Sequence, residues 1–127
     1  MEQYITGLQH VGIKAEDIEA STAFYEDLGF KVAHRTNLDE ETRVVYLEQK
    51  GLIVELIETK EAPGTGVVDH ITIDVTDIEA VFAEAQEKGY TIVEGGGINF
   101  LPFWERGIKF IMLEGPSGER VELNQML

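Results

Sequence analysis

Two histidines and two glutamates occupy corresponding places in the two halves of this chain, and their types could bind a divalent metal. His10 and His70 each stand at the start of a predicted strand, and Glu55 and Glu122 each lie inside a run of apolar residues. A carboxylate inside an apolar strand is costly unless it is paired, hydrogen-bonded or bound to a metal. Two imidazoles and two carboxylates suit Zn, Ni, Co, Mn or Fe, and a five- or six-coordinate ion would keep a position free for a substrate.

The two halves repeat one pattern with an offset of 60 residues. The matches are His10 with His70, Asp17-Ile18-Glu19-Ala20 with Asp77-Ile78-Glu79-Ala80, and Gly29-Phe30 with Gly89-Tyr90. A single Glu in a strand most often faces water, because alternate residues of a strand share one face. That explanation would have to hold at every one of the matching positions, so the repeat favours metal ligation. His34 has no histidine counterpart, and we expect it on the surface or next to the ligands.

Composition limits the classes of partner. The chain has 127 residues, which predicts one domain, and a net charge of −14, which disfavours nucleic acid and anionic membranes but favours a cation. It has no Cys, so disulfides and thiolate ligands are excluded. No signal-peptide pattern or membrane-length apolar run is present, and we expect a cytoplasmic protein.

Hydrophobic periodicity predicts a β-α-β-β-β order in each half, and therefore the α+β class. The first half has strands at 7–14, 30–36, 42–49 and 52–59 with a helix at 17–28. The second has strands at 67–75, 90–94, 107–114 and 119–125 with a helix at 77–88, a capping box of Thr76 with Glu79, and a loop at 95–106. We predict a single domain over 1–127, made of module 1 (5–59), a Pro- and Gly-rich linker (60–66) and module 2 (67–127).

These motifs make the chain similar to the vicinal oxygen chelate superfamily, and within it to the small bacterial glyoxalase I (lactoylglutathione lyase) type. The resemblance rests on His10, Phe24-Tyr25 before Leu28-Gly29-Phe30, Glu55, His70, Gly115-Pro-Ser-Gly118 and Glu122. It implies the glyoxalase/bleomycin resistance/dihydroxybiphenyl dioxygenase fold, in which tandem modules form a curved mixed sheet around one metal. It also implies His10, Glu55, His70 and Glu122 as ligands of Ni, Co, Zn or Mn, with Fe ranked after them, and a homodimer.

The implied reaction converts the hemithioacetal of a 2-oxoaldehyde and a thiol to a 2-hydroxyacyl thioester, as in methylglyoxal detoxification. The metal would stabilise an enediolate while a carboxylate moves the proton. We favour Glu122 as this base, with Glu55 able to act on the opposite face. The alternatives are a thioester epimerase like methylmalonyl-CoA epimerase, a binding protein without turnover, and a dioxygenase, which would require iron and oxygen.

Five further residues are candidates for substrate contact. Lys14 and Thr59 stand where the glyoxalase I pattern has an Arg and an Asn, and the Arg contacts glutathione. In the Gly-rich stretch 95–107, Phe103 and Trp104 could cover a site and Arg106 could bind an anionic group. The alternative is that these aromatic residues cap the core or a dimer contact. The sequence leaves open the native metal, the thiol, and whether the dimer exchanges modules.

Overall fold

The computed structural model describes residues 2–4, 6, 8–66 and 68–127. The chain forms two compact units, Met1–Ala62 and Pro63–Leu127, which are described here one at a time. Their boundary falls within the predicted linker 60–66. Three predicted starting points lie outside the described residues: residue 5 for module 1, residue 7 for the first strand, and residue 67 for module 2 and its first strand.

Unit 1 is a four-stranded sheet with one long helix. Its elements are the short 3-10 helix η1 (Glu2–Tyr4), β1 (Val11–Ala15), α1 (Ile18–Asp27), β2 (Lys31–Asn37), β3 (Arg43–Gln49) and β4 (Leu52–Glu58). The strand order is β1-β4-β3-β2, with β1 parallel to β4 and the other neighbours antiparallel. This mixed sheet confirms the predicted β-α-β-β-β order and the antiparallel pairing of the strands after the helix.

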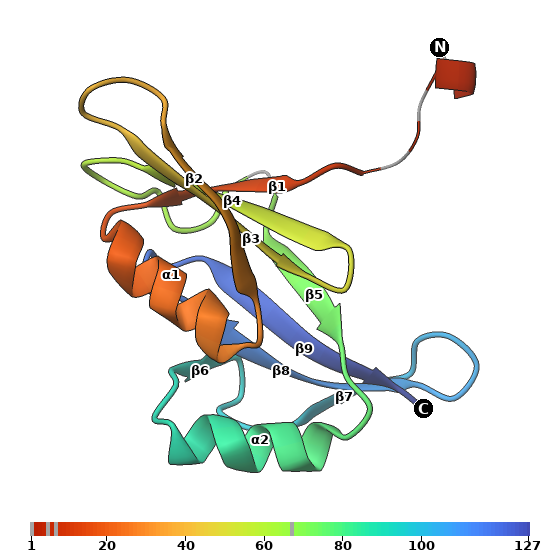
Figure 1. Ribbon diagram of the computed structural model, residues 1–127. Coiled ribbons are helices and arrows are strands. Elements are labelled where there is room, and N and C mark those ends of the chain that lie inside the picture. The colour runs from red at the N-terminus through yellow and green to blue at the C-terminus, as the bar shows by residue number, and fades with distance from the viewer. Residues whose placement is uncertain (1, 5, 7, 67) are drawn as a thin grey trace. The chain divides into compact units, whose positions relative to one another are not determined.

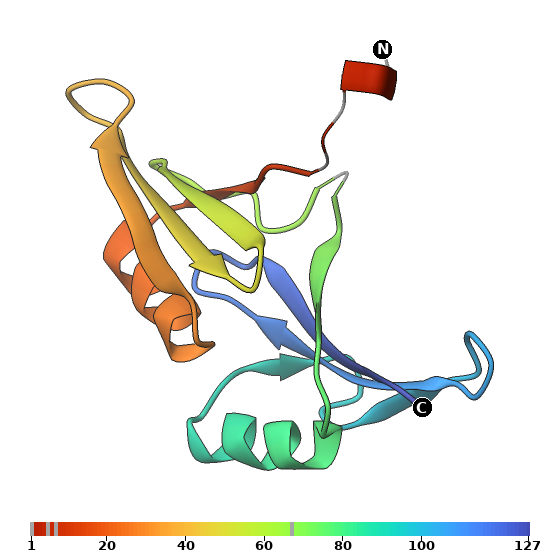
Figure 2. The same cartoon turned by 45° about the vertical axis from the view of Figure 1, so that its right-hand side comes forward.

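The helix α1 covers one face of this sheet (Figures 1 and 2). Its side chains Ile18, Phe24 and Tyr25 are buried, while Leu28, which follows the helix, is half-buried. Alternate residues of the strands share a face, and most of the buried apolar side chains of the sheet gather on one side. These are Ala15, Val45, Leu47, Val54 and Leu56, whereas the buried Val44 lies on the other face with Tyr46. The opposite face carries the predicted ligands.

Unit 2 repeats the arrangement and adds one short strand. Its elements are β5 (His70–Asp74), α2 (Ile78–Glu87), β6 (Ile92–Val93), β7 (Asn99–Leu101), β8 (Ile108–Glu114) and β9 (Arg120–Met126). The strand order is β5-β9-β8-β6, with β5 parallel to β9 and with β7 also paired to β8. The prediction of a loop over 95–106 was therefore wrong in its middle, because Asn99–Leu101 forms an antiparallel pair with the start of β8.

The two helices begin and end in the same way, which explains why the sequence located them well. Asp17 and Asp77 are the N-caps, and their side chains accept hydrogen bonds from the backbone N–H of Ala20 and Ala80, each at 3.0 Å. The predicted capping box with Thr76 was wrong, because Asp77 already provides the cap. No helix within the described residues has the length and apolar character needed to span a bilayer.

Candidate metal centre

The first predicted ligand pair forms at the β1–β4 edge of unit 1. Gly12 of β1 is in register with Glu55 of β4, so His10, two residues earlier, lies on the same face as Glu55. The distance from His10 Nε2 to Glu55 Oε2 is 3.1 Å. The other ring nitrogen of His10, Nδ1, is in hydrogen-bond contact with Oε1 of Gln9. The structure therefore brings His10 and Glu55 together, with Nε2 and Oε2 facing each other.

Tyr46 is a residue of this site that the sequence reasoning missed. It lies opposite Glu55 in the β3–β4 pair, and its O–H donates a hydrogen bond to Oε1 of Glu55. Its ring is edge-on to the ring of His10, with centroids 5.7 Å apart and an interplanar angle of 87°. The hydrogen bond to Glu55 raises the pKa of Tyr46, and burial and the carboxylate charge raise it further.

The predicted strands 42–49 and 52–59 contained the signal for Tyr46. A two-residue turn at Lys50-Gly51 places residue 49 opposite 52, and the antiparallel count then reaches Tyr46 opposite Glu55. His34 follows on the next strand, in register with Tyr46, and is exposed. The ring centroids of His34 and Tyr46 are 6.1 Å apart at an angle of 39°.

The second predicted pair forms in the same place in unit 2. Thr72 of β5 is in register with Glu122 of β9, and His70 Nε2 lies 3.5 Å from Glu122 Oε2. His70 Nδ1 lies 2.7 Å from Asp69 Oδ2. Asn124 donates from Nδ2 to Oε1 of Glu122 at 2.7 Å. As in unit 1, one oxygen of the carboxylate is held by another side chain, and the other oxygen faces the imidazole.

The His70 side of unit 2 carries a chain of charges that His10 does not share. Arg120 lies 3.4 Å from Asp69 and forms an ion pair with Glu94. The hydrogen bond with His70, and then the charge of Arg120, lower the pKa of Asp69. Asp69 is therefore anionic at neutral pH and is a stronger acceptor for His70 Nδ1 than the neutral amide of Gln9 is for His10.

The structure thus presents two His–Glu pairs, one in each unit. Within the described part of the chain, no three His, Asp or Glu side chains converge on one point. The predicted set of four ligands stays a prediction. The predicted base Glu122 and the second carboxylate, Glu55, are each half of one pair.

Of the predicted substrate residues, two lie on the ligand face of unit 1. Lys14 on β1 and Thr59 just after β4 have the same alternation as His10 and Glu55, and so share their face. Lys14 is exposed, and the Thr59 hydroxyl donates to the Glu61 carbonyl at 3.3 Å.

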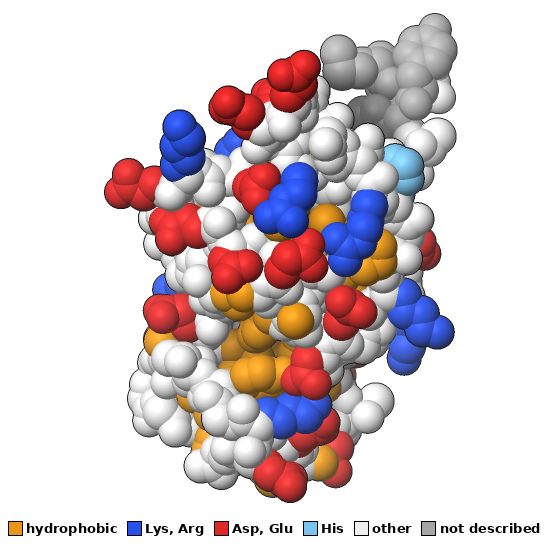
Figure 3. Space-filling model, turned by 60° about the vertical axis from the view of Figure 1, so that its left-hand side comes forward, with side chains coloured by type: hydrophobic (Ala, Val, Ile, Leu, Met, Phe, Trp, Pro, Cys, Tyr) orange, Lys and Arg blue, Asp and Glu red, His pale blue; other side chains and the backbone are white. Residues whose placement is uncertain are grey.

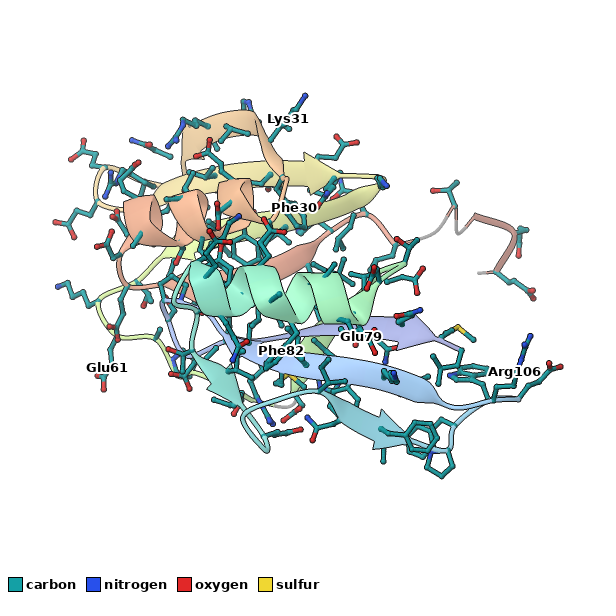
Figure 4. The ribbon with its side chains drawn as sticks, turned by 90° about the horizontal axis from the view of Figure 1, so that it is seen from below. Phe30, Lys31, Glu61, Glu79, Phe82 and Arg106 are labelled. Carbon is teal, nitrogen blue, oxygen red and sulfur yellow. The ribbon has the colours of Figure 1, made fainter. Side chains whose placement is uncertain are left out.

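The other three lie at the tip of the β7–β8 hairpin of unit 2. Phe103, Trp104 and Arg106 are exposed there, and Trp104 is 78% exposed. Arg106 stands at the outer end of the hairpin (Figure 4). These residues therefore do not cap the core of unit 2.

The surface charge favours a cation. Asp and Glu side chains are spread over the face drawn in Figure 3, with Lys and Arg among them. The net charge of −14 raises the local concentration of divalent cations by long-range attraction.

Comparison with known proteins identifies one family and one curated relative. The model of the Glyoxalase/Bleomycin resistance protein/Dioxygenase superfamily matches residues 7–123. The chain is 31% identical over 125 residues to the uncharacterized protein YwbC of Bacillus subtilis (strain 168), covering 93% of this chain and 96% of YwbC.

Two solved structures are similar in fold. A glyoxalase family protein from Enterococcus faecalis has a TM-score of 0.79 and 24% identity, over 95% of this chain and 98% of that one. The fosfomycin resistance protein FosX from Listeria monocytogenes, solved with Mn(II) and sulfate, has a TM-score of 0.75 and 14% identity, over 97% of this chain and 94% of FosX.

Proposed function

The chain belongs to the Glyoxalase/Bleomycin resistance protein/Dioxygenase superfamily, and we propose that it is a metal-dependent glyoxalase I-like enzyme of that superfamily. It would convert the hemithioacetal of a 2-oxoaldehyde and a thiol to the 2-hydroxyacyl thioester. The proposed ligands of one divalent ion are His10, Glu55, His70 and Glu122. The observation that carries the proposal is the way each imidazole is held in its pair.

Each imidazole has oxygen acceptors at both of its nitrogens. In His70, Nδ1 faces the Asp69 carboxylate at 2.7 Å and Nε2 faces the Glu122 carboxylate at 3.5 Å. A neutral imidazole has only one N–H, so Nδ1–H can donate while Nε2 offers a lone pair to a negative oxygen. A cation between Nε2 and the carboxylate would satisfy both the lone pair and the negative oxygen. An outer carboxylate that fixes Nδ1–H is the usual support of a metal-binding histidine.

The separations in both pairs fit two ligands of one ion. Atoms that are each about 2.1 Å from a metal lie about 3.0 Å apart at 90° and about 3.4 Å apart at a tetrahedral angle. The Nε2–Oε2 distances are 3.1 Å in unit 1 and 3.5 Å in unit 2. Nitrogen and oxygen donors without sulfur suit Ni, Co, Zn, Mn or Fe, and the resemblance ranks Fe after the other four.

The chain's own residues then have distinct tasks. A divalent cation in this site would supply Lewis-acid stabilisation of negative charge on two adjacent substrate oxygens. Glu122 takes the proton from the substrate C–H and returns it to the neighbouring carbon. His10 and His70 remain ligands, and Glu55 acts as ligand or as base on the opposite face.

Residues outside the ligand set would bind the rest of the substrate. Lys14 lies on the ligand face of unit 1 and offers a cation to an anionic thiol such as glutathione, and Thr59 adds a hydroxyl. In unit 2, Phe103 and Trp104 would exclude water, and Arg106 would meet a second anionic group.

Metal-reconstituted turnover tests the proposal. The purified protein would be stripped of metal and reloaded separately with Ni, Co, Zn and Mn, and conversion of the methylglyoxal–glutathione hemithioacetal would be followed by ultraviolet absorbance. We expect turnover that depends on the metal. Absence of turnover in protein that holds one metal per site would contradict the glyoxalase I assignment while keeping the ligands.

A thioester epimerase is the second candidate, because it would use the same proton transfer. Lys14 favours an epimerase over a glyoxalase I. It stands where the glyoxalase I pattern has the arginine that contacts glutathione, and a lysine lacks the bidentate fork with which arginine binds a carboxylate. An epimerase would exchange the α-proton of a 2-methylmalonyl thioester with solvent deuterium, and a glyoxalase I would not.

We also propose a homodimer. Among the described residues, each unit holds one of the two predicted His–Glu pairs, so the four proposed ligands come from two units, of one chain or of two. Light scattering of the metal-free and metal-loaded protein would measure the mass, and a monomer in both states would contradict the dimer.

A further inference from the structure

Tyr46 contacts both residues of the pair in unit 1. We propose that Tyr46 is a positioning residue: its O–H fixes Oε1 of Glu55, so that Oε2 is the oxygen this carboxylate presents beside His10. The inference rests on the proposed metal site and adds a residue to it.

The sheet register places Tyr46 where it can do this. Glu55 and Tyr46 are cross-strand partners, so their side chains leave neighbouring strands on the same face. The Tyr46 O–H reaches Oε1, while the edge-on ring contact at 5.7 Å supports the imidazole of His10. One side chain therefore limits the rotation of the carboxylate and of the imidazole together.

The donors that hold Oε1 of Glu55 and Oε1 of Glu122 are not copies of each other produced by the duplication. The partner of Glu122 at the equivalent position is Met112, whose thioether has no hydrogen to donate. In unit 2 the donor to Glu122 is Asn124, two residues further along the same strand. The residue two positions after Glu55 in unit 1 is the apolar Ile57, which cannot donate. Both carboxylates thus have Oε1 held, by residues of different type at different positions.

A free carboxylate next to an ion can bind through one oxygen or through both. With Oε1 engaged by Tyr46, Glu55 is restricted to one. Removing the O–H should then lower the affinity for the metal and also change the set of bound atoms. A residue that only packs against the sheet would change neither.

Co(II) binding to the Tyr46→Phe variant tests this. Phe keeps the ring beside His10 and removes only the hydroxyl. His34→Ala is the matched control, because it removes the other ring next to Tyr46 without touching Glu55. Glu55→Gln reports whether Glu55 is a ligand. For each variant, the Co(II) dissociation constant would be measured by chelator competition, the visible spectrum at saturation, and the melting temperature of the metal-free protein.

We expect Tyr46→Phe to bind Co(II) roughly 10- to 100-fold more weakly, as loss of an outer partner commonly does. Its spectrum at saturation should differ from the parent, and His34→Ala should match the parent in both. Parent affinity and spectrum in Tyr46→Phe, together with weakened binding in Glu55→Gln, would overturn the role of Tyr46 alone. Parent affinity in Glu55→Gln would overturn the four-ligand site and, with it, this role. A lower melting temperature of metal-free Tyr46→Phe with a parent spectrum would also overturn it.

Discussion

Replacing Glu122 with Gln separates the two roles proposed for this residue. Glutamine keeps the shape of the side chain but replaces one carboxylate oxygen with an NH2 group. In the native site, Oε1 accepts from Asn124 at 2.7 Å and Oε2 faces His70 Nε2 at 3.5 Å. With the Asn124 amide in its present orientation, the new amide points its NH2 at Nδ2 of Asn124, donor against donor, or toward His70 and the proposed metal.

Either orientation leaves one polar interaction unmade. An unmade interaction at a buried group costs about 1–3 kcal/mol, which is roughly a 5- to 150-fold loss of metal affinity. Loss of a general base is a separate effect of roughly 10²- to 10⁴-fold on turnover. At saturating metal, we therefore expect Glu122→Gln to be slower by that second factor, with the circular dichroism spectrum of the parent.

A second substitution separates the loss of metal affinity from the loss of the general base. In Glu122→Gln with Asn124→Asp, the new carboxylate at position 124 accepts from the new amide, which turns its oxygen back toward His70. Metal affinity should recover in part in this double variant, since an amide oxygen still stands in for a carboxylate oxygen, and hemithioacetal turnover should not recover. Near-parent turnover in metal-saturated Glu122→Gln would refute Glu122 as base. Recovery of turnover along with affinity in the double variant would show that Glu122 acts only as a ligand.

Three further predictions concern parts of the chain away from the ligands. A Cβ on Gly115 would overlap the buried carboxylate of Glu119, so Gly115→Ala should lower the free energy of unfolding by about 1–3 kcal/mol in a urea titration. Arg43 lowers the pKa of Glu58 from its usual 4.5, so the ion pair stabilises the protein above that pH and is lost as the pH falls through the lowered pKa. The melting temperature of Glu58→Gln should thus lie below that of the parent at neutral pH, with the gap closing in acid. Trp104→Ala should change the free energy of unfolding by less than about 0.5 kcal/mol, because the ring is 78% exposed, and should raise KM for the hemithioacetal.

The helices and long strands could be predicted because each has a local signal of its own. The predicted helices 17–28 and 77–88 agree with Ile18–Asp27 and Ile78–Glu87 to within one residue at each end, since an Asp cap and a following Gly limit both. The strand Asn99–Leu101 was missed because three residues in a Gly-rich stretch carry no periodic pattern. Its pairing with β8 depends on residues further along the chain, which a local pattern cannot reveal.

Of the residues that support the ligands, some could be predicted from the sequence repeat and others could not. The acceptors of the two imidazoles, Gln9 and Asp69, occupy equivalent places directly before each histidine, so the repeat itself contained them. The donors to the two carboxylates, Tyr46 and Asn124, occupy different places, and no comparison of the halves could reveal them.

This difference bears on why the pairs exist. A carboxylate that only had to be tolerated inside a duplicated strand could keep whatever neighbour the duplication supplied. Instead, each half holds Oε1 with a donor of its own and leaves Oε2 beside an imidazole nitrogen. Where no proton lies between Nε2 and Oε2, their lone pairs repel each other, and a cation that joins the two atoms offsets this cost. The common feature of the two halves is therefore the orientation of Nε2 and Oε2, which is the property that binding a metal requires.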